Sequence, residues 1–258
     1  MRVAVMGIVN VTPDSFSDGG RYFEREAAIA HGLELVSEGA TIVDVGGEST
    51  RPGALEVPED EELRRVIPVV EALSGAARVS IDTRKPAVAR AAVRAGATIV
   101  NDVTGQLGPV AADCGAAWVA MHSQGDPQTM QLAPRYKDVV GEVAGYLEER
   151  LEIAARYGVG EVYLDPGIGF GKTVEHNLQL LANLDRIVSL GAPVLIGLSR
   201  KSFLAQLSPA GRAGAPLDRE DQTLGANILA IMAGARVVRV HEVRPLRQFL
   251  GLLEAMRK

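Results

Sequence analysis

The chain has 258 residues and a net charge of -5, with 47% hydrophobic and 23% charged residues, a composition typical of a globular protein with a large core. The slight acidity argues against non-specific affinity for nucleic acid or anionic membranes, because both require a surplus of lysine and arginine. Cys114 is the single cysteine, which excludes an intramolecular disulfide and a cysteine-based zinc site.

The first apolar run, Met1 to Val9, is too short to span a membrane and lacks a small-residue cleavage site. It predicts a first strand instead of a targeting segment. We therefore expect a cytoplasmic protein.

Short apolar runs rich in valine and isoleucine recur along the chain, and most lack strict alternation, as expected of strands buried on both faces. They cover Val3–Val9, Thr41–Val45, Arg78–Ile81, Thr98–Val100, Ala117–Met121, Val162–Leu164, Pro193–Ile196 and Val237–Val240. Between them lie segments with helical spacing, such as Leu63, Val66, Ile67 and Val70. The alternation predicts one domain, residues 1–258, folded as a single (β/α)8 barrel, with an open doubly wound sheet as the alternative.

Four long irregular segments follow predicted strands. They are Asn10–Phe23, Gly46–Pro58, Ser123–Lys137 and Ser199–Arg219. Barrel enzymes carry their active sites at this end of the strands, so we expect these loops to surround a site.

Polar residues also gather where the predicted strands end. Each could be a helix cap or a turn residue, but acids, amides and cations at all eight ends together indicate a ligand site. Asp82, Asn101 and Asp165 suit a ligand with a row of N–H donors, since carboxylate oxygens accept paired N–H contacts from an aminopyrimidine edge.

The cations Arg51, Lys201, Arg239 and His241 would bind an anion. Arg239 and His241 are two residues apart on a predicted strand, so their side chains lie on the same side. Anion binding is our preferred interpretation of this pair, and an arginine that bridges barrel acids is the alternative.

The segment Asp165–Thr173 is similar to a phosphate-binding loop but has Pro166 where the Walker pattern requires glycine. We interpret it as a strand-to-helix turn that brings backbone close to a ligand, with Phe170 available for packing. Lys172 is interpreted as a solvated or helix-end charge.

Seven segments in order resemble the signatures of the dihydropteroate synthases, from the first predicted strand to the last. The longest are Gly7-Ile-Val-Asn-Val-Thr-Pro-Asp-Ser-Phe-Ser-Asp-Gly-Gly20 and Gly46-Gly-Glu-Ser-Thr-Arg-Pro-Gly53. The others are Ser80–Thr83, Val100–Asp102, Leu164–Phe170, Gly197–Ser202 and Arg239–His241.

The resemblance implies a (β/α)8 barrel that condenses 6-hydroxymethyl-7,8-dihydropterin diphosphate with 4-aminobenzoate and acts as a homodimer. The residues that would hold the pterin are Asp82, Asn101, Asp165 and Lys201. Those that would bind the diphosphate are Thr50, Arg239 and His241, with Asn10 near Mg²⁺. The loop residues that would close over the site and shape the 4-aminobenzoate pocket are Asp14, Phe16, Ser17, Thr50, Arg51 and Pro52, with Phe170 and Ser202 beside them.

The route implied by the resemblance is dissociative: diphosphate leaves first, and the aromatic amine then attacks a pterin-methyl cation. Such chemistry requires charge stabilisation at both ends and no activated nucleophile. Asp82, Lys201, Arg239 and His241 are therefore the candidate catalytic residues.

Ser123 and Asp126 depart from the family pattern, which affects local substrate contacts and not the reaction. A pterin-binding methyltransferase domain is the nearest alternative, because it shares the barrel and the pterin acids. A catalytically silent pterin binder and a Schiff-base aldolase using Lys201 are the remaining alternatives.

Overall fold

The computed structural model describes residues 3–12, 21–49, 54–125, 129–207 and 219–256. Its strands are β1 (Ala4–Asn10), β2 (Ile42–Gly46), β3 (Arg78–Asp82), β4 (Ile99–Asp102), β5 (Ala117–Met121), β6 (Val162–Asp165), β7 (Leu195–Ile196) and β8 (Val237–Val240). Its helices are α1 (Arg21–Ser37), α2 (Glu59–Leu73), α3 (Pro86–Arg94), α4 (Gly108–Cys114), α5 (Val139–Tyr157), α6 (Val174–Ala182), α7 (Leu184–Val188), α8 (Ser202–Gln206), α9 (Glu220–Met232) and α10 (Val243–Ala255).

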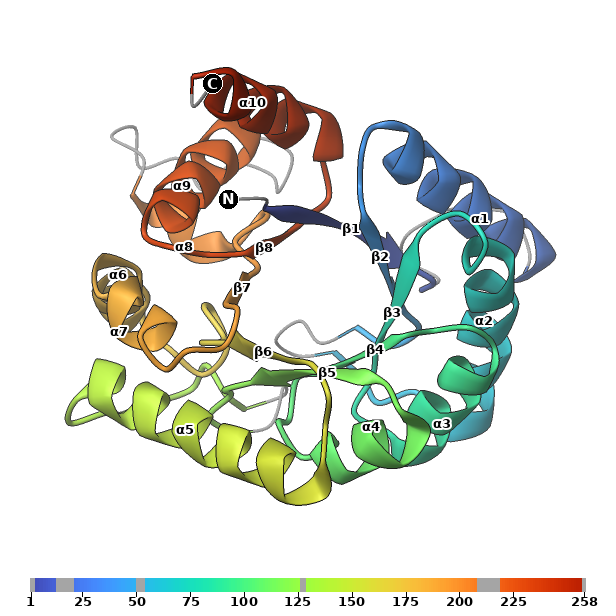
Figure 1. Cartoon of the computed structure of the whole chain (residues 1–258), viewed down its shortest axis with the longest axis horizontal. Coiled ribbons are helices and arrows are strands. Elements are labelled where there is room, and N and C mark those ends of the chain that lie inside the picture. Colours follow the sequence, from blue (N-terminus) through green and yellow to red (C-terminus); the bar gives the residue numbers. More distant parts are fainter. Residues whose placement is uncertain (1–2, 13–20, 50–53, 126–128, 208–218, 257–258) are drawn as a thin grey trace.

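The strands form one parallel sheet in the order β6-β5-β4-β3-β2-β1-β8-β7. A parallel bridge between Leu164 and Val194 joins the two outer strands, and the amide of Leu164 donates to the carbonyl of Pro193 at 3.0 Å. The sheet thus curls into a barrel surrounded by helices (Figure 1). The (β/α)8 prediction is confirmed, and the open sheet is excluded.

The barrel interior is apolar near the beginnings of the strands and polar near their ends. Side chains of Met6, Ile42, Ile99, Tyr163 and Val237 belong to one buried cluster. Because side chains alternate along a strand, the residues two positions further on also point inward. On β2, β4, β6 and β8 these residues are Asp44, Asn101, Asp165 and Arg239.

A second, larger core lies between the sheet and the helices. It includes the outward-facing strand residues Val43, Val45 and Ile81 and the apolar side of α2, for example Val66 and Val70. The apolar periodicity of the sequence predicted this packing, and both faces of the strands are buried as expected.

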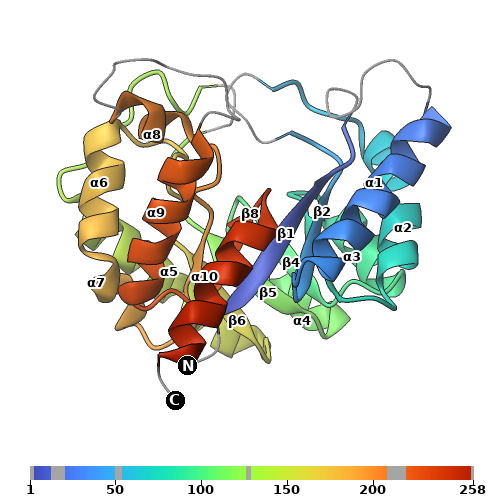
Figure 2. The same cartoon turned by 90° about the horizontal axis from the view of Figure 1, so that it is seen from above.

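One predicted strand is shorter than its apolar run. The run Pro193–Ile196 contributes only Leu195 and Ile196 as β7. Pro193 has no N–H to donate to a sheet ladder, and Val194 forms an isolated bridge to Leu164. Figure 2 shows that the described parts of the segments after the strands lie at one end of the barrel, away from the end where β1 begins and α10 ends. Within the described residues, no helix is long and apolar enough to cross a membrane.

Candidate active site

Arg239 and two aspartates form the floor of the polar end of the barrel. The Nε of Arg239 donates to Asp44 Oδ2 at 2.6 Å, and its Nη2 donates to Asp82 Oδ2 at 2.8 Å. Asn101 Nδ2 donates to the same Asp44 oxygen at 2.9 Å. The contacts are those of an arginine that bridges barrel acids, while binding of an anion by Arg239 stays a prediction.

Asp44 is the functional candidate that the sequence analysis missed. It is fully buried, and it lies between Val43 and Val45 in what looks like an uninterrupted apolar strand. The alternation of side chains along the strand could have identified it. Asp44 is two residues before Gly46, where the loop begins, so the two residues face the same side of the strand.

Several polar atoms at this floor have no protein partner. Among the described residues, Asp44 Oδ1, Ser80 Oγ and Asp82 Oδ1 are buried without a hydrogen bond. Buried polar groups are rarely left unpaired in folded proteins, so these atoms are available to a ligand or to water. Burial raises the pKa of Asp82 to about 7, an effect that the charge of Arg239 opposes.

Asp165 and Lys201 extend the floor on the side of β6 and β7. Asp165 Oδ1 accepts a hydrogen bond from the amide of Gly167 at 2.7 Å, and burial raises the pKa of this carboxyl. Burial lowers the pKa of Lys201 to about 8, while the charge of Asp165 opposes that shift. The pKa of the acid is thus raised and that of the amine lowered by the same burial, and shifts of this kind are common in functional sites.

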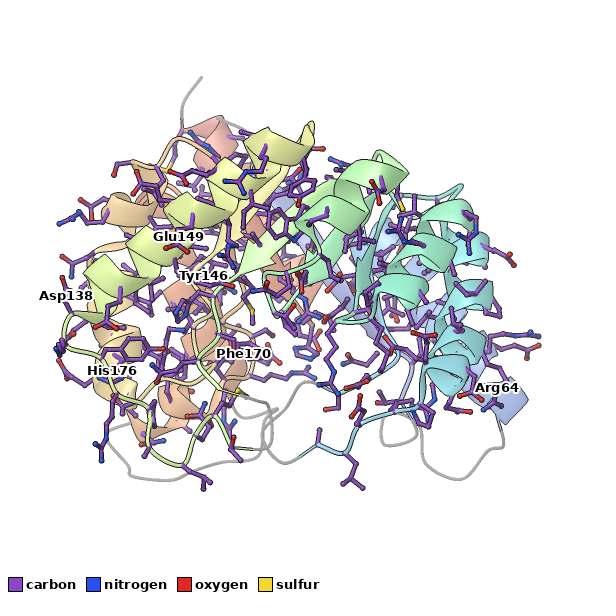
Figure 3. The ribbon with its side chains drawn as sticks, turned by 90° about the horizontal axis from the view of Figure 1, so that it is seen from below. Arg64, Asp138, Tyr146, Glu149, Phe170 and His176 are labelled. Carbon is purple, nitrogen blue, oxygen red and sulfur yellow. The ribbon has the colours of Figure 1, made fainter. Side chains whose placement is uncertain are left out.

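Phe170 lies over Lys201 on the loop side. The amine of Lys201 lies 3.9 Å from the centre of the Phe170 ring, a distance at which a cation is attracted by the ring face. Figure 3 shows Phe170 toward the loop end of the barrel, with Tyr146 deeper in the molecule.

The remaining described candidates lie around the rim. His241 Nδ1 is 2.9 Å from Ser199 Oγ, which also accepts from the His241 amide at 3.2 Å. Ser202 is exposed at the first position of α8. Asn10 ends β1 beside Gly46 and is half-buried.

The structure therefore brings together five predicted residues, namely Asp82, Asn101, Asp165, Lys201 and Arg239. The predicted loop residues Asp14, Phe16, Ser17, Thr50, Arg51 and Pro52 lie outside the described residues, as does Asp126.

Ionic contacts anchor the segment that leads to Thr50. Lys85 Nζ binds carboxylates of both Glu48 and Glu62, and the Thr83 hydroxyl donates to Glu62 Oε1 at 2.7 Å. Arg84 Nη2 pairs with Glu48 at 2.8 Å. Glu62 is fully buried, so this acid of the α2 first turn contacts side chains and is not a solvated charge.

The interpretation of Lys172 as a solvated or helix-end charge is wrong. Lys172 is 3% exposed, and its amine contacts His122 Nδ1 at 3.0 Å and the carbonyl of Gly167 at 2.9 Å. The glycine-rich turn folds back over the lysine, so the side chain lies beneath the turn. Backbone curvature of this kind is not visible in residue spacing.

A barrel with a buried floor of acids and amides facing cations is expected to bind a polar heterocycle. The model of the pterin binding enzyme family matches residues 6–241. The chain belongs to this family, and its relatives narrow the assignment to the dihydropteroate synthases.

Dihydropteroate synthase from Escherichia coli strain K12 is 45% identical over 259 residues, which cover 97% of this chain and 90% of that protein. The structure of Xanthomonas albilineans dihydropteroate synthase with 4-aminobenzoic acid has a TM-score of 0.91 and 48% identity, covering 99% of this chain and 93% of that one. The structure of that enzyme in complex with 7,8-dihydropteroate has a TM-score of 0.88 and 45% identity, covering 99% and 94%.

Proposed function

We propose that this chain is a dihydropteroate synthase, which joins 6-hydroxymethyl-7,8-dihydropterin diphosphate to 4-aminobenzoate and releases diphosphate. The observation that carries the proposal is the buried set of unpaired acceptors on Asp44 and Asp82, opposite Lys201 in a barrel of this family. The high similarity to dihydropteroate synthases over nearly the whole chain favours this activity over a pterin-binding methyltransferase domain.

The acceptors explain how the pterin would be recognised. An aminopyrimidine edge presents several N–H donors, which would pair with Asp82, Asn101 and Asp165. Lys201 would donate to a ring nitrogen or to the carbonyl oxygen. A ligand without these donors would leave the acceptors unpaired at a cost of about 1–3 kcal/mol each, which gives selectivity for pterins.

The reaction breaks the bond between the pterin methylene carbon and the bridging oxygen, and diphosphate leaves with the electron pair. The amine of 4-aminobenzoate then forms the new C–N bond and loses a proton. Carboxylates such as Asp82 would stabilise the pterin-methyl cation, and Arg239 and His241 would stabilise the leaving anion.

Mg²⁺ is the metal ion that we propose for the diphosphate. The described residues contain no cluster of three or more His, Cys, Asp or Glu that could bind a metal, which fits an ion that keeps its waters and binds mainly to substrate phosphate. Asn10, half-buried at the end of β1, would supply one oxygen ligand. When bound, the ion would neutralise charge on the leaving diphosphate.

We also propose that the protein is a cytoplasmic homodimer. Leu229 and Met232 of α9, Leu252 of α10 and Met256, which follows α10, are large exposed hydrophobic residues. The two helices lie side by side (Figures 1 and 2). Exposed apolar side chains on neighbouring helices are typical of an interface. Light scattering should give twice the chain mass for wild type and a monomer for Leu229→Glu.

The activity is tested by incubating the folded protein with pterin diphosphate, labelled 4-aminobenzoate and Mg²⁺. We expect labelled dihydropteroate, and none when the diphosphate is replaced by the free alcohol. Absence of product with the complete mixture would contradict the proposal.

The order of bond breaking has a separate test. With ¹⁸O in the bridging position and no 4-aminobenzoate, a dissociative step should scramble the label between bridging and non-bridging oxygens. A synthase that shows no scrambling while diphosphate stays bound would contradict the dissociative route without affecting the activity.

A further inference from the structure

Lys172 is a buried amine for which the proposed reaction has no use. Its Nζ contacts the carbonyls of Gly167 and Phe170 at 2.9 and 3.0 Å and His122 Nδ1 at 3.0 Å. An ammonium group has three N–H donors, and these three acceptors, with the carbonyl of His122 at 3.4 Å as a longer fourth contact, can pair with all of them. In the part of the chain that the structure describes, none of these partners is a carboxylate, so the amine is held by backbone and imidazole.

The imidazole has the state that this contact requires. Burial first, and the nearby Lys172 charge second, lower the pKa of His122 to about 3, so its ring is neutral and Nδ1 can accept. Burial also lowers the pKa of Lys172 to about 7, while the charge of Asp165 opposes this shift. All the acceptors around Nζ are oriented to receive N–H donors of the amine.

The partners of Lys172 lie on two different loops. His122 directly follows β5, whereas Gly167 and Phe170 bracket the turn between β6 and α6. Gly167 also donates its amide to Asp165, and the Phe170 ring lies over the Lys201 amine. The amine of Lys172 therefore holds the backbone of two residues that contact the polar floor.

The turn between β6 and α6 packs tightly against the segment after β5. Gly167 has φ +65°, and a Cβ there would lie 1.8 Å from the carbonyl oxygen of His122. Gly171 has φ +60°, and a Cβ there would lie 2.2 Å from the carbonyl oxygen of Gln124. Both positions require glycine, and both show the turn pressed against the segment after β5.

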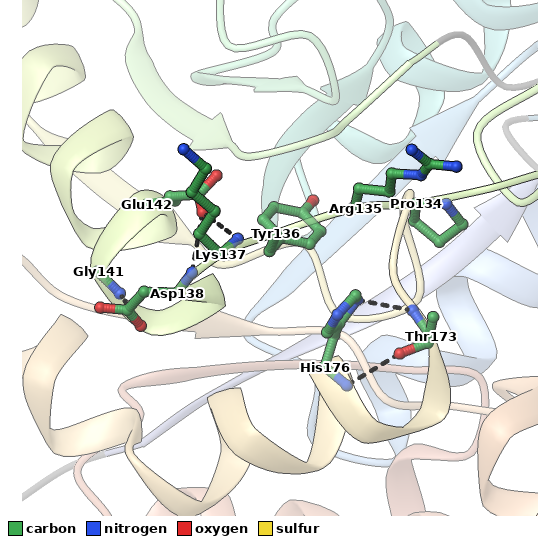
Figure 4. A pocket seen from close by; sticks show the side chains of 9 residues that line it. All are labelled: Pro134, Arg135, Tyr136, Lys137, Asp138, Gly141, Glu142, Thr173 and His176. Atoms are coloured by element: carbon green, nitrogen blue, oxygen red, sulfur yellow. Dashed lines mark hydrogen bonds between the residues drawn. The ribbon is translucent and has the colours of Figure 1, made fainter.

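Aromatic residues seal the amine from outside. The Tyr136 hydroxyl donates to the carbonyl of Gly171 at 3.0 Å, and its ring centre is 6.0 Å from Lys172 Nζ. Tyr136 also lines a surface pocket with Thr173 and His176 (Figure 4). The rings of His122 and Tyr146 pack in a T-shaped contact, with their centres 4.9 Å apart. The amine of Lys172 is thus shielded from solvent, and the residue is 3% exposed.

We propose that Lys172 is a positioning residue for the pterin site: its ammonium joins the loops after β5 and β6 and so fixes Asp165 and Phe170 against the bound pterin. The inference rests on the proposed function, because it assumes that the polar floor binds a pterin. It assigns Lys172 no contact with the substrate.

The test compares Lys172→Met, which keeps the length of the side chain but cannot donate, with Lys137→Met as a matched control. Lys137 is exposed on the loop before α5. The probe is 6-hydroxymethylpterin, titrated calorimetrically, together with KM and kcat for the complete reaction. We expect Lys172→Met to raise the dissociation constant and the KM for pterin diphosphate by about tenfold or more, as for the loss of about 1.4 kcal/mol. The kcat at saturation should fall much less, and the control should resemble wild type.

His122→Phe is the second variant, in case Lys172→Met does not fold. It preserves an aromatic contact with Tyr146 but removes one acceptor, so a weaker loss of pterin affinity is expected. Unchanged pterin affinity in whichever folded variant is measured would overturn the inference, as would a loss confined to kcat. Failure of the proposed function would be recognised separately, as absence of dihydropteroate formation by the wild-type protein.

Discussion

Replacing Arg239 by methionine should destabilise the fold strongly, because the guanidinium pairs with two buried carboxylates. Asp44 is fully buried, and the Asp82 side chain is 9% exposed. Removal of one partner from a buried ion pair costs about 3–5 kcal/mol, since the remaining charge is left uncompensated. The cost is limited by Asp82, whose pKa of about 7 would rise further without Arg239 and allow protonation. For a domain of this size, about 3–5 kcal/mol corresponds to a fall of about 6–20 °C in melting temperature.

Differential scanning calorimetry measures this loss, with Arg244→Met as the matched control. Arg244 pairs with Glu38, but its side chain is 68% exposed, so its loss should cost less than about 1 kcal/mol. Adding Asp44→Asn to Arg239→Met should restore part of the stability, because one unpaired charge is removed. An Arg239→Met protein that melts with the wild type would refute this account of the floor.

Turnover of the same variant addresses the anion-binding role. If Arg239 stabilises the departing diphosphate, kcat of the folded fraction should fall by about 10²-fold or more, with little change in binding of a pterin lacking diphosphate. Normal turnover by the surviving folded enzyme would leave Arg239 as a purely structural residue.

Three further predictions concern the β5 and β6 side of the barrel. Asp165→Asn should weaken pterin binding by about 1–3 kcal/mol, because an amide presents a donor where two acceptors are needed; unchanged calorimetric affinity would remove Asp165 from the pocket. Gly167→Ala should lower the free energy of unfolding by about 2–4 kcal/mol, because the added Cβ would overlap the His122 carbonyl. A urea unfolding curve that matches the wild type would contradict the turn geometry. The pKa of His122 is about 3 in the folded state and about 6.5 in the unfolded state. As the pH falls, the unfolded chain is protonated at this residue before the folded chain is. The free energy of unfolding therefore decreases as the pH falls from about 6.5 toward 3. Lowering the pH from 7.5 to 5 should cost about 2 kcal/mol at this residue, and an equal pH slope in His122→Phe would exclude it as the source.

The strands were predictable because burial on both faces leaves a simple mark, a run of valine and isoleucine. The same logic placed Asp82, Asn101 and Asp165 at the polar end of the barrel. It failed at Asp44, whose valine neighbours hide an inward-facing charge within an apolar run. For Asp44, the two-residue period of the strand would have predicted the inward-facing side chain, whereas the apolar composition of the run concealed it.

Lys172 was misjudged for a different physical reason. Its burial depends on left-handed glycines at 167, 169 and 171, and these fold the turn back over the amine. The sequence shows where the glycines lie, but it does not show the direction in which the backbone turns at each of them. The partner His122 is also 50 residues away in sequence, so no local pattern connects the two.

The pairing between neighbouring strands is not equally extensive around the barrel, and it is weakest where the barrel closes between β6 and β7. β1 and β2 are paired over five residues, whereas the barrel closes between β6 and β7 through an isolated bridge from Leu164 of β6 to Val194, the residue before β7. Local opening follows the weakest pairing, so backbone amides beside this bridge should take up deuterium soonest among the strands. Asp165 ends one of these strands and Gly197 follows the other, so a pterin bound across them would hold the junction shut. Deuterium uptake at this junction would then report occupancy of the site without any label on the substrate.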